Sequence, residues 1–271
     1  MNNIYRSIAD KFIWSYSRIE CFLDCPYRFF LKYFYGAQEE DRFYASYGSF
    51  LHTLIEQYYR GELSKDEMLF AYLMRFKSEV KGTRPSENTV KKYISSGVEY
   101  LQNFNPFPFN MIDVEKKTDF YIGDIPFTGY IDYLGEKDGE YYIVDNKSRD
   151  LKPRSKRIKP TVKDVELDSM LRQLYIYSAA VKQEYGKFPK ALCFNCFRTG
   201  TFIVEPFAED KYYSTIDWAK KTIENIKNTD DFYPNIEFFS CRYICGVSKE
   251  CCYDQQVREG RGLRYNESRR Y

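Results

Sequence analysis

The middle of the chain shows the short apolar runs and turn residues that are typical of β-strands. The β-prone runs are, in chain order, residues 114–122, 128–134, 141–145, 190–197 and 201–204. The second and third runs flank residues 135–140, which contain an Asp-Gly pair and a further glycine. We therefore expect a turn there and pairing of the two runs as a β-hairpin. The last two runs flank Arg198-Thr199-Gly200 and predict a second hairpin.

Both flanks of this region carry apolar residues at helical spacing. The predicted helices are residues 15–35, 43–60, 65–80, 86–104, 164–186 and 208–229. Pro26 marks a break in the first of them. We therefore expect an α/β protein with a mixed central sheet built on residues 111–205 and flanked by helices. A helical region over residues 12–110 precedes the sheet.

Two aspartates and a lysine lie on the predicted hairpin. Asp132 is within its first strand, Asp145 ends its second strand, and Lys147 follows two positions later. Because side chains two apart in a strand point to the same face, Asp145 and Lys147 project together while Asn146 turns away. The hairpin can bring Asp132 alongside them, although the same spacing also fits solvated residues at strand ends. Glu115, on the preceding strand, is a further acidic group near the site and is interpreted as an ordinary strand carboxylate.

This set of residues suits metal-dependent hydrolysis of a phosphodiester. Two carboxylates and the backbone carbonyl of Asn146 are oxygen ligands of the kind that Mg²⁺ prefers, and they leave sites for phosphate and water. A bound metal lowers the pKa of its water and neutralises charge on the phosphate. Lys147 is then placed to orient that water or to stabilise the developing charge.

Charge is distributed unevenly along the chain. The 271 residues carry a formal net charge of only +2, which does not by itself indicate nucleic-acid binding. Residues 147–163, however, contain eight basic residues and one acidic residue. With two prolines and no apolar period, the segment is predicted to be a mobile basic loop, either a solvated face or a phosphate-contacting surface. Its candidate DNA-contacting residues are Arg154, Lys156 and Arg157.

The sequence has no run of about 18 apolar residues, and its N-terminus lacks a signal-peptide core. We therefore expect a soluble, cytoplasmic protein with no membrane partner. In that compartment the eight cysteines favour free thiols or metal ligands over disulfides. Cys193 and Cys196 point to opposite faces of a predicted strand and are interpreted as core thiols. Four others fall within twelve residues, a density that packing does not explain: Cys241, Cys245, Cys251 and Cys252.

Several short motifs follow one another along the chain. They are Ser15 and Ser17 with Cys25-Pro26 and Arg28-Phe29, Gly48 with His52, Gly129 with Asp132, Asp145 with Lys147, and Gln173 with Tyr177. In this order they resemble the S-x-S…CP-x-R-F, G-x-x-x-H, G-x-x-D, D-x-K and Q-x-x-x-Y motifs of RecB-family nucleases in the PD-(D/E)XK superfamily. The cysteines near the C-terminus resemble the cluster of the iron–sulfur subgroup, which includes AddB-type and CRISPR-associated spacer-acquisition nucleases.

The resemblance implies a role for each matched residue. The implied ligands of Mg²⁺ or Mn²⁺ are His52, Asp132, Asp145 and the carbonyl of Asn146. Lys147 would assist the attacking water. Gln173 and Tyr177 would position the DNA or the lysine.

The resemblance also implies a [4Fe–4S] cluster that joins the terminal regions in one lobe. Its ligands would be Cys25, Cys241, Cys245 and one of Cys251 and Cys252. The spacing of three and then five residues differs from the family's common pattern. It leaves open which of the last two cysteines is a ligand, and it also leaves open a structural Zn²⁺ site.

We expect one nuclease domain over residues 12–252, with its catalytic core at 111–205, a C-terminal helix and cysteine cluster at 206–252, and a basic, mobile tail at 253–271. The expected function is a metal-dependent DNA nuclease, an exonuclease on single-stranded or frayed ends in recombination, repair or phage DNA metabolism. No G-x-x-x-x-G-K-[ST] motif occurs, so a helicase or recombination partner would be a separate chain. Two alternatives stay open: a non-catalytic nucleic-acid-binding accessory protein with the same fold, and a zinc-stabilised interaction module.

Overall fold

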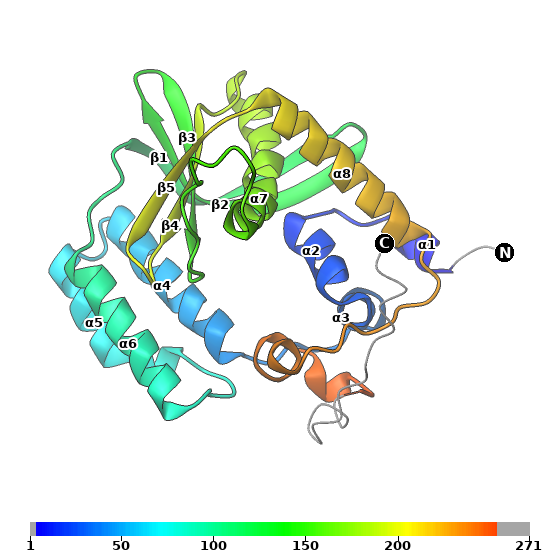
Figure 1. Cartoon of the computed structure of the whole chain (residues 1–271), viewed down its shortest axis with the longest axis horizontal. Helices are drawn as coiled ribbons and strands as arrows, with labels where there is room; N and C mark the ends of the chain where they lie inside the picture. Colours follow the sequence, from blue (N-terminus) through cyan, green and yellow to red (C-terminus); the bar gives the residue numbers. More distant parts are fainter. Residues whose placement is uncertain (1–3, 254–271) are drawn as a thin grey trace.

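A five-stranded sheet with its strands in sequence order lies at the centre of the molecule (Figure 1). The computed structural model describes residues 4–253, so the predicted tail lies outside the described residues apart from its first position. The strands are β1 (Asn110–Ile122), β2 (Ile125–Lys137), β3 (Glu140–Lys147), β4 (Ala191–Cys196) and β5 (Thr201–Pro206). Neighbouring strands are antiparallel except β3 and β4, which are parallel. The expected mixed sheet is therefore confirmed.

The predicted hairpin of β2 and β3 has a tighter turn than expected. Asp138 and Gly139 form the turn with positive φ angles of 55° and 76°, as in a two-residue turn whose twist matches its strands. Gly135 lies within β2, where a Cβ would come within 2.6 Å of the Cβ of Phe109. The predicted hairpin and its turn at the Asp-Gly pair are therefore confirmed, but the turn is confined to residues 138–139, because Gly135 makes room for a packed side chain and does not reverse the chain.

The first part of the chain consists of short helices. After α1 (Ile4–Ala9), α2 (Tyr16–Asp24) ends at Cys25, whose backbone is extended at φ −160°. Pro26 then opens α3 (Pro26–Phe30), which continues into a π-helical turn (Leu31–Tyr35). Proline is favoured at a first helical position because it has no N–H to donate. The break expected at Pro26 is therefore confirmed, and it separates two helices.

Two groups of longer helices cover the sheet. α4 (Phe43–Tyr59), α5 (Lys65–Glu79) and α6 (Glu87–Gln102) share a core with Phe197, which follows β4 (left side of Figure 1). α7 (Val162–Tyr185) and α8 (Glu209–Lys227) pack together with the sheet and α2.

Adjacent residues of β3 enter different cores because the sheet is covered on both faces. Ile143 packs in the core that α7 contributes to, whereas Val144 packs in the core beside α4. Side chains alternate along a strand. This alternation places Asp145 and Lys147 on the side of α7 and the side chain of Asn146 on the opposite side.

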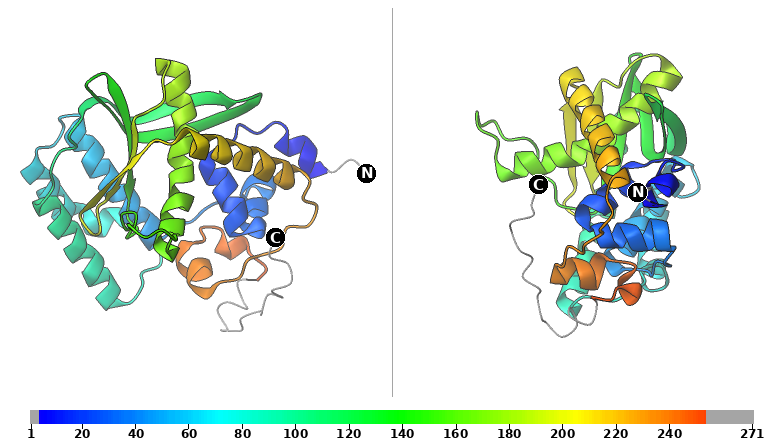
Figure 2. Two further views of the ribbon diagram at one scale, coloured as in Figure 1. Left: turned by 45° about the horizontal axis from the view of Figure 1, so that its top comes forward. Right: turned by 90° about the vertical axis from the view of Figure 1, so that its right-hand side faces the viewer.

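The two terminal regions of the chain meet in one lobe (orange beside blue in Figure 2). Arg42 donates from Nε to the carbonyl of Cys245 at 2.7 Å and from Nη2 to the hydroxyl of Ser248 at 2.6 Å. The N–H of Glu40 donates to the carbonyl of Gly246 at 2.9 Å. Within residues 4–253, none of the helices combines the length and apolar character that crossing a membrane requires.

Candidate active site

The hairpin brings the two predicted aspartates together. Tyr133 pairs with Val144 between β2 and β3, so Asp132 and Asp145 lie opposite each other one step further on. At that step the hydrogen bond between the strands is made by a side chain and not by a backbone carbonyl. Oδ2 of Asp132 accepts the N–H of Asn146 at 2.6 Å. The two aspartates are buried, with exposed fractions of 9% and 3%. Because buried carboxylates are costly without partners, nearby cations and donors decide their charge state.

His52 reaches this pair from α4. Its Nε2 lies 3.0 Å from the carbonyl oxygen of Asn146. Its Nδ1 lies 3.5 Å from Oδ2 of Asp132 and 3.6 Å from Oε1 of Glu115. The ring packs edge-on against Phe197, with 5.9 Å between the ring centroids. The structure thus places His52 between the two aspartate-bearing strands and a further carboxylate on β1.

Glu115 is a site residue that the sequence analysis interprets as an ordinary strand carboxylate. The pairing of β1 with β2 places it opposite Asp132. Its φ of 50° is uncommon for a residue other than glycine. Backbone conformations of this kind cost free energy and concentrate at functional sites. A regular strand pattern does not predict this conformation. The one signal in the sequence that Glu115 belongs to the site was its expected position across from Asp132.

The donor atoms of His52, Glu115 and Asp132 lie within 4.8 Å of one another. They border an open cavity of about 500 Å³ that Asp145 and Lys147 also line. Carboxylate oxygens with one imidazole nitrogen form a donor set that suits Mg²⁺ or Mn²⁺. The residues present therefore fit the divalent ion that the sequence predicts, with Glu115 added to the expected ligands.

Burial sets the electrostatics of the site. It raises the pKa of Asp145 to about 6, although Lys147 acts in the opposite direction, and it also raises the pKa of Asp132. Burial alone would lower the pKa of His52. The carboxylates of Asp132, Glu115 and Asp145 outweigh it and raise that pKa to about 9. The surrounding carboxylates thus favour the protonated imidazole, and a divalent ion held by the same carboxylates would compete with that proton.

Lys147 lies between β3 and α7. Its Nζ is 2.8 Å from Oδ2 of Asp145 and donates to Oε1 of Gln173 at 2.8 Å. The other end of that amide, Nε2, donates to the hydroxyl of Tyr177 at 3.4 Å. Gln173 and Tyr177 are four residues apart on α7 and so share a face, as the sequence predicts. The amide of Gln173 thus holds the ammonium group beside the carboxylate.

A glycine in β2 makes room for Tyr177. A Cβ on Gly129 would lie 2.5 Å from Cε1 of Tyr177, closer than two carbon atoms approach. Burial raises the pKa of Tyr177 to about 12, so its hydroxyl stays protonated. A Cβ on Gly48 would meet Oγ of Ser148 at an ordinary 3.6 Å. Of these two motif glycines, Gly129 is therefore the one that close packing requires.

Glu20, on α2, is another acidic residue that the sequence analysis does not single out. Burial alone would lower the pKa of Lys147, but Asp145, Asp132 and Glu20 outweigh it and raise that pKa. Burial raises the pKa of Glu20 itself, and Lys147 acts against that rise. The sequence around Glu20 carries no signal of this proximity, because it depends on how α2 packs against the sheet.

The basic segment after β3 is anchored near its centre. Arg154 donates to both oxygens of Asp168, at 3.2 and 2.7 Å, and to Glu205 at 2.7 Å. These bonds join the segment to α7 and β5. Arg154, one of the three predicted DNA-contacting residues, therefore already binds two carboxylates.

Asp164 clamps the two ends of the exposed tip of this segment. Its carboxylate accepts bonds of 2.6 to 2.7 Å from the N–H and hydroxyl groups of both Ser155 and Thr161. Residues 156–160 project between these two positions, and all are exposed. They include the predicted DNA-contacting residues Lys156 and Arg157, followed by Ile158, which is fully exposed at 101%.

The sequence matches the family model of the PD-(D/E)XK nuclease superfamily over residues 13–252, which include the whole sheet and the site described above. The chain belongs to the PD-(D/E)XK nuclease superfamily. A crystal structure from Eubacterium rectale, described as that of a candidate exonuclease, matches this nuclease with a TM-score of 0.50 and 15% identity over 98% of this chain and 94% of that chain. At this identity the match concerns the fold alone.

A second solved structure, of SSO0001, has a TM-score of 0.29 and 16% identity over 87% of this chain and 85% of that chain, which is too distant to carry an argument. No curated protein matches the sequence. The family match therefore establishes a nuclease-superfamily chain, and the geometry of the site carries the finer conclusions.

This member of the superfamily also has a cysteine-lined cavity of about 460 Å³ where its terminal regions meet. The cysteines that line it are Cys25, Cys241, Cys245 and Cys251. The backbone N–H groups of Arg28 and Asn235 each donate to Sγ of Cys25 at 3.4 Å. Cys252 instead donates to the hydroxyl of Tyr27 at 3.4 Å. The fold thus gathers cysteines that are more than two hundred residues apart in the sequence.

Proposed function

We propose that this chain is a metal-dependent DNA nuclease that acts as an exonuclease on single-stranded or frayed ends. The position of Lys147 carries the proposal. Its ammonium group lies 2.8 Å from both Asp145 and Gln173, beside the cavity that the candidate metal ligands border. A divalent-ion site next to a fixed cation supplies the charges that phosphodiester hydrolysis requires.

The proposed ligands of Mg²⁺ or Mn²⁺ are His52, Glu115, Asp132, Asp145 and the carbonyl of Asn146. When bound, the ion supplies a water of lowered pKa and neutralises charge on the phosphate. The donors come from α4, β1, β2 and β3. Because these are regular elements and not loops, packing holds the donors in place before a substrate arrives.

Lys147 is proposed to hold the attacking water or the phosphate oxygen on which charge develops. Gln173 directs the ammonium group, and Tyr177 directs the amide of Gln173. The buried carboxylate of Asp145 keeps Lys147 charged, because loss of the lysine proton would leave that carboxylate without its cation. In this proposal, each of these four residues therefore positions one proton or one charge near the reacting phosphate.

The exposed tip at residues 156–160 is proposed to contact DNA phosphates through Lys156 and Arg157, while Arg154 holds the loop to α7 and β5. Gln173 lies eleven positions beyond the start of α7 at Val162, a rise of about 16 Å along the helix. DNA as the substrate, in preference to RNA, is supported by the family resemblance.

Duplex DNA must be opened before an enzyme of this kind can act away from frayed ends. The sequence has no G-x-x-x-x-G-K-[ST] motif with which to bind a nucleoside triphosphate. We therefore propose that a separate helicase or recombination protein supplies open ends. The corresponding processes are recombination, repair or phage DNA metabolism.

We also propose that the cysteine-lined cavity holds a [4Fe–4S] cluster on Cys25, Cys241, Cys245 and Cys251. A Zn²⁺ site needs four sulfurs about 2.3 Å from one ion, and hence about 4 Å from one another. The [4Fe–4S] assignment is supported by the resemblance of these four cysteines to the ligands of the iron–sulfur subgroup, in which several irons share the thiolates.

Linear and circular single-stranded DNA distinguish the parts of this proposal. With Mg²⁺ or Mn²⁺, the protein should shorten end-labelled linear strands and leave circular strands intact. Asp145→Asn, which keeps the side-chain shape and removes its charge, is the matched inactive variant. Cleavage of circular DNA would contradict the exonuclease assignment but keep the nuclease. No metal-dependent cleavage of either substrate would contradict both.

A further inference from the structure

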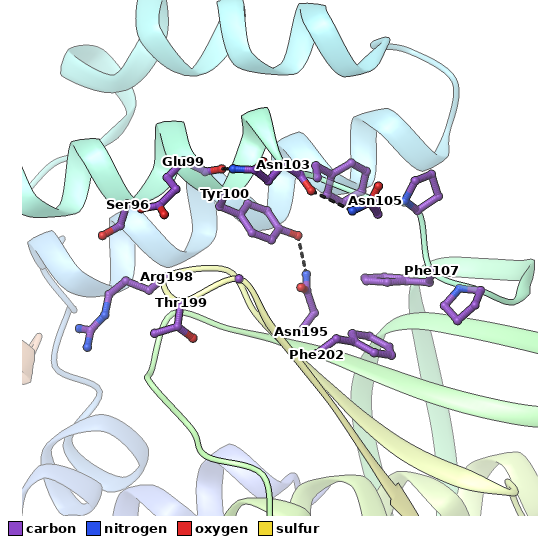
Figure 3. Close-up of a pocket in the computed structure, with 14 residues that line it drawn as sticks. Ser96, Glu99, Tyr100, Asn103, Asn105, Phe107, Asn195, Arg198, Thr199 and Phe202 are labelled. Carbon is purple, nitrogen blue, oxygen red and sulfur yellow. Dashed lines mark hydrogen bonds between the residues drawn. The ribbon is translucent and has the colours of Figure 1, made fainter.

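A third cavity, of about 420 Å³, lies between α6, the segment that follows it and the hairpin of β4 and β5 (Figure 3). Its volume is in the range of small-molecule binding sites. Figure 3 shows the side chains that matter here, Tyr100, Phe107, Asn195 and Phe202, around one end of the cavity. None of these residues lines the candidate active-site cavity.

The floor of this third cavity presents one hydrogen-bond donor and one acceptor. Asn195 and Tyr100 are only 5% and 7% exposed. The amide nitrogen of Asn195 donates to the hydroxyl oxygen of Tyr100 and to Oδ1 of Asn146, each at 2.7 Å. Both of its hydrogens are then used, which leaves Oδ1 of Asn195 as an acceptor and the O–H of Tyr100 as a donor. Burial raises the pKa of Tyr100, so that hydroxyl keeps its proton.

Aromatic rings form the wall beside this floor. The rings of Phe107 and Phe202 stack with 5.4 Å between centroids and 25° between planes. Phe107 is buried and also stacks on Tyr59, whereas Phe202 is only half-buried and is the ring that can attract a second flat ring. Glu99, the carboxylate that lines the cavity, is exposed. Arg198 lines the same cavity and carries the opposite charge, so the two charges offset and a neutral ring fits the interior.

We propose that this cavity binds a nucleobase, either one base of a DNA strand or the base of a released nucleotide. A nucleobase is a flat, neutral ring whose edge carries donors and acceptors side by side, which matches both the floor and the wall. Asn146, the second partner of Asn195, places its carbonyl oxygen 3.0 Å from Nε2 of His52. Two side chains therefore connect the cavity to the candidate metal site. The inference rests on the proposed function for the supply of nucleobases and adds a site outside the catalytic cavity.

Binding of deoxynucleoside 5′-monophosphates to the full-length protein in EDTA tests the proposal, with calorimetry as the measurement. Deoxyribose 5-phosphate, which has the sugar and the phosphate without a base, is the matched ligand. The monophosphates should bind and the sugar phosphate should not. Absence of base-dependent binding would overturn the proposal. Because the assay needs no metal and no cleavage, its failure is distinct from failure of the proposed nuclease function.

Two substitutions locate the binding. Phe202→Ala removes a stacking face and should raise the Kd roughly tenfold. Tyr100→Phe removes the hydroxyl alone, keeps the ring and should raise the Kd several-fold. Phe70→Ala, at a 66% exposed phenylalanine of α5 outside the cavity, should leave the Kd unchanged. Melting curves identify the folded variants. Base-dependent binding that neither cavity substitution weakens would overturn the assignment.

Competition in EDTA identifies the source of the base. If a base of the DNA strand occupies the cavity, a single-stranded oligonucleotide and a monophosphate should displace each other, and Phe202→Ala should weaken both. If the cavity takes released nucleotides, the oligonucleotide should leave the Kd of the monophosphate unchanged. Either pattern supports a nucleobase site, and insensitivity of both ligands to Phe202→Ala would refute it.

Discussion

The ammonium nitrogen of Lys147 lies 2.8 Å from the side-chain carbonyl oxygen of Gln173. This contact makes Gln173 a positioning residue, because it directs the cation and is not one of the three grouped metal donors. Gln173→Ala should therefore lower kcat by roughly 10- to 100-fold while the KM for DNA changes little. Gln183→Ala is the matched control, since Gln183 lies on the same helix and bonds the backbone of Tyr121. Equal losses in both variants would contradict this role.

Glu115 is expected to contribute to metal binding. Glu115→Gln removes the negative charge of a carboxylate whose Oε1 lies 3.6 Å from Nδ1 of His52. The substitution should weaken Mn²⁺ binding by roughly tenfold or more. Titration calorimetry with Mn²⁺ measures this directly, without any DNA. Glu184→Gln is the control, because Glu184 forms its ion pair with Lys116 instead. An unchanged Mn²⁺ affinity for Glu115→Gln would remove Glu115 from the ligand set.

The exposed tip of the basic segment should contribute to DNA binding through charge alone. Reversing Lys156 and Arg157 to glutamate should weaken binding of the inactive Asp145→Asn protein and reduce the salt dependence by about one unit of slope per residue. Reversing the exposed Lys220 and Lys221 of α8 is the control with the same change in net charge. If both double variants show the same slope, the tip is a solvated face.

The cysteine cavity should bind iron and stabilise the fold. Cys25→Ser should lose iron from anaerobically purified protein and lower the free energy of unfolding by about 4 kcal/mol, by analogy with a cross-link that closes a long loop. Cys252→Ser should keep its iron, because Cys252 does not line the cavity. Iron analysis and denaturant unfolding are the measurements. Zinc in place of iron, or iron retained in Cys25→Ser, would contradict the cluster.

Local periodicity was sufficient to predict the core of the candidate site. The spacing of Asp145 and Lys147 and the hairpin through Asp132 follow from the two-residue repeat of strands, and the structure brings all three together. The four-residue spacing of Gln173 and Tyr177 similarly placed them on one helix face. These relationships lie within one element or between adjacent strands, where sequence distance and spatial distance agree.

Relationships between distant elements could not be predicted in the same way. The bonds from Arg154 to Asp168 and Glu205 join residues that are 14 and 51 positions apart in the sequence. Glu115 reaches the site through a backbone conformation, φ 50°, that a strand pattern does not encode. The donor and acceptor pair of Tyr100 and Asn195 likewise depends on the packing of α6 against the sheet. Such contacts emerge only when the whole fold is known.

Cleavage of end-labelled single-stranded DNA by anaerobically purified protein tests the central claim most directly. The reaction is run with Mg²⁺, Mn²⁺ or EDTA, beside the Asp132→Ala variant, which lacks a carboxylate at the centre of the proposed metal site. The account predicts degradation with either metal, none in EDTA and none by the variant. Equal inertness of wild type and variant, with both still binding DNA, would contradict it and favour a non-catalytic accessory protein.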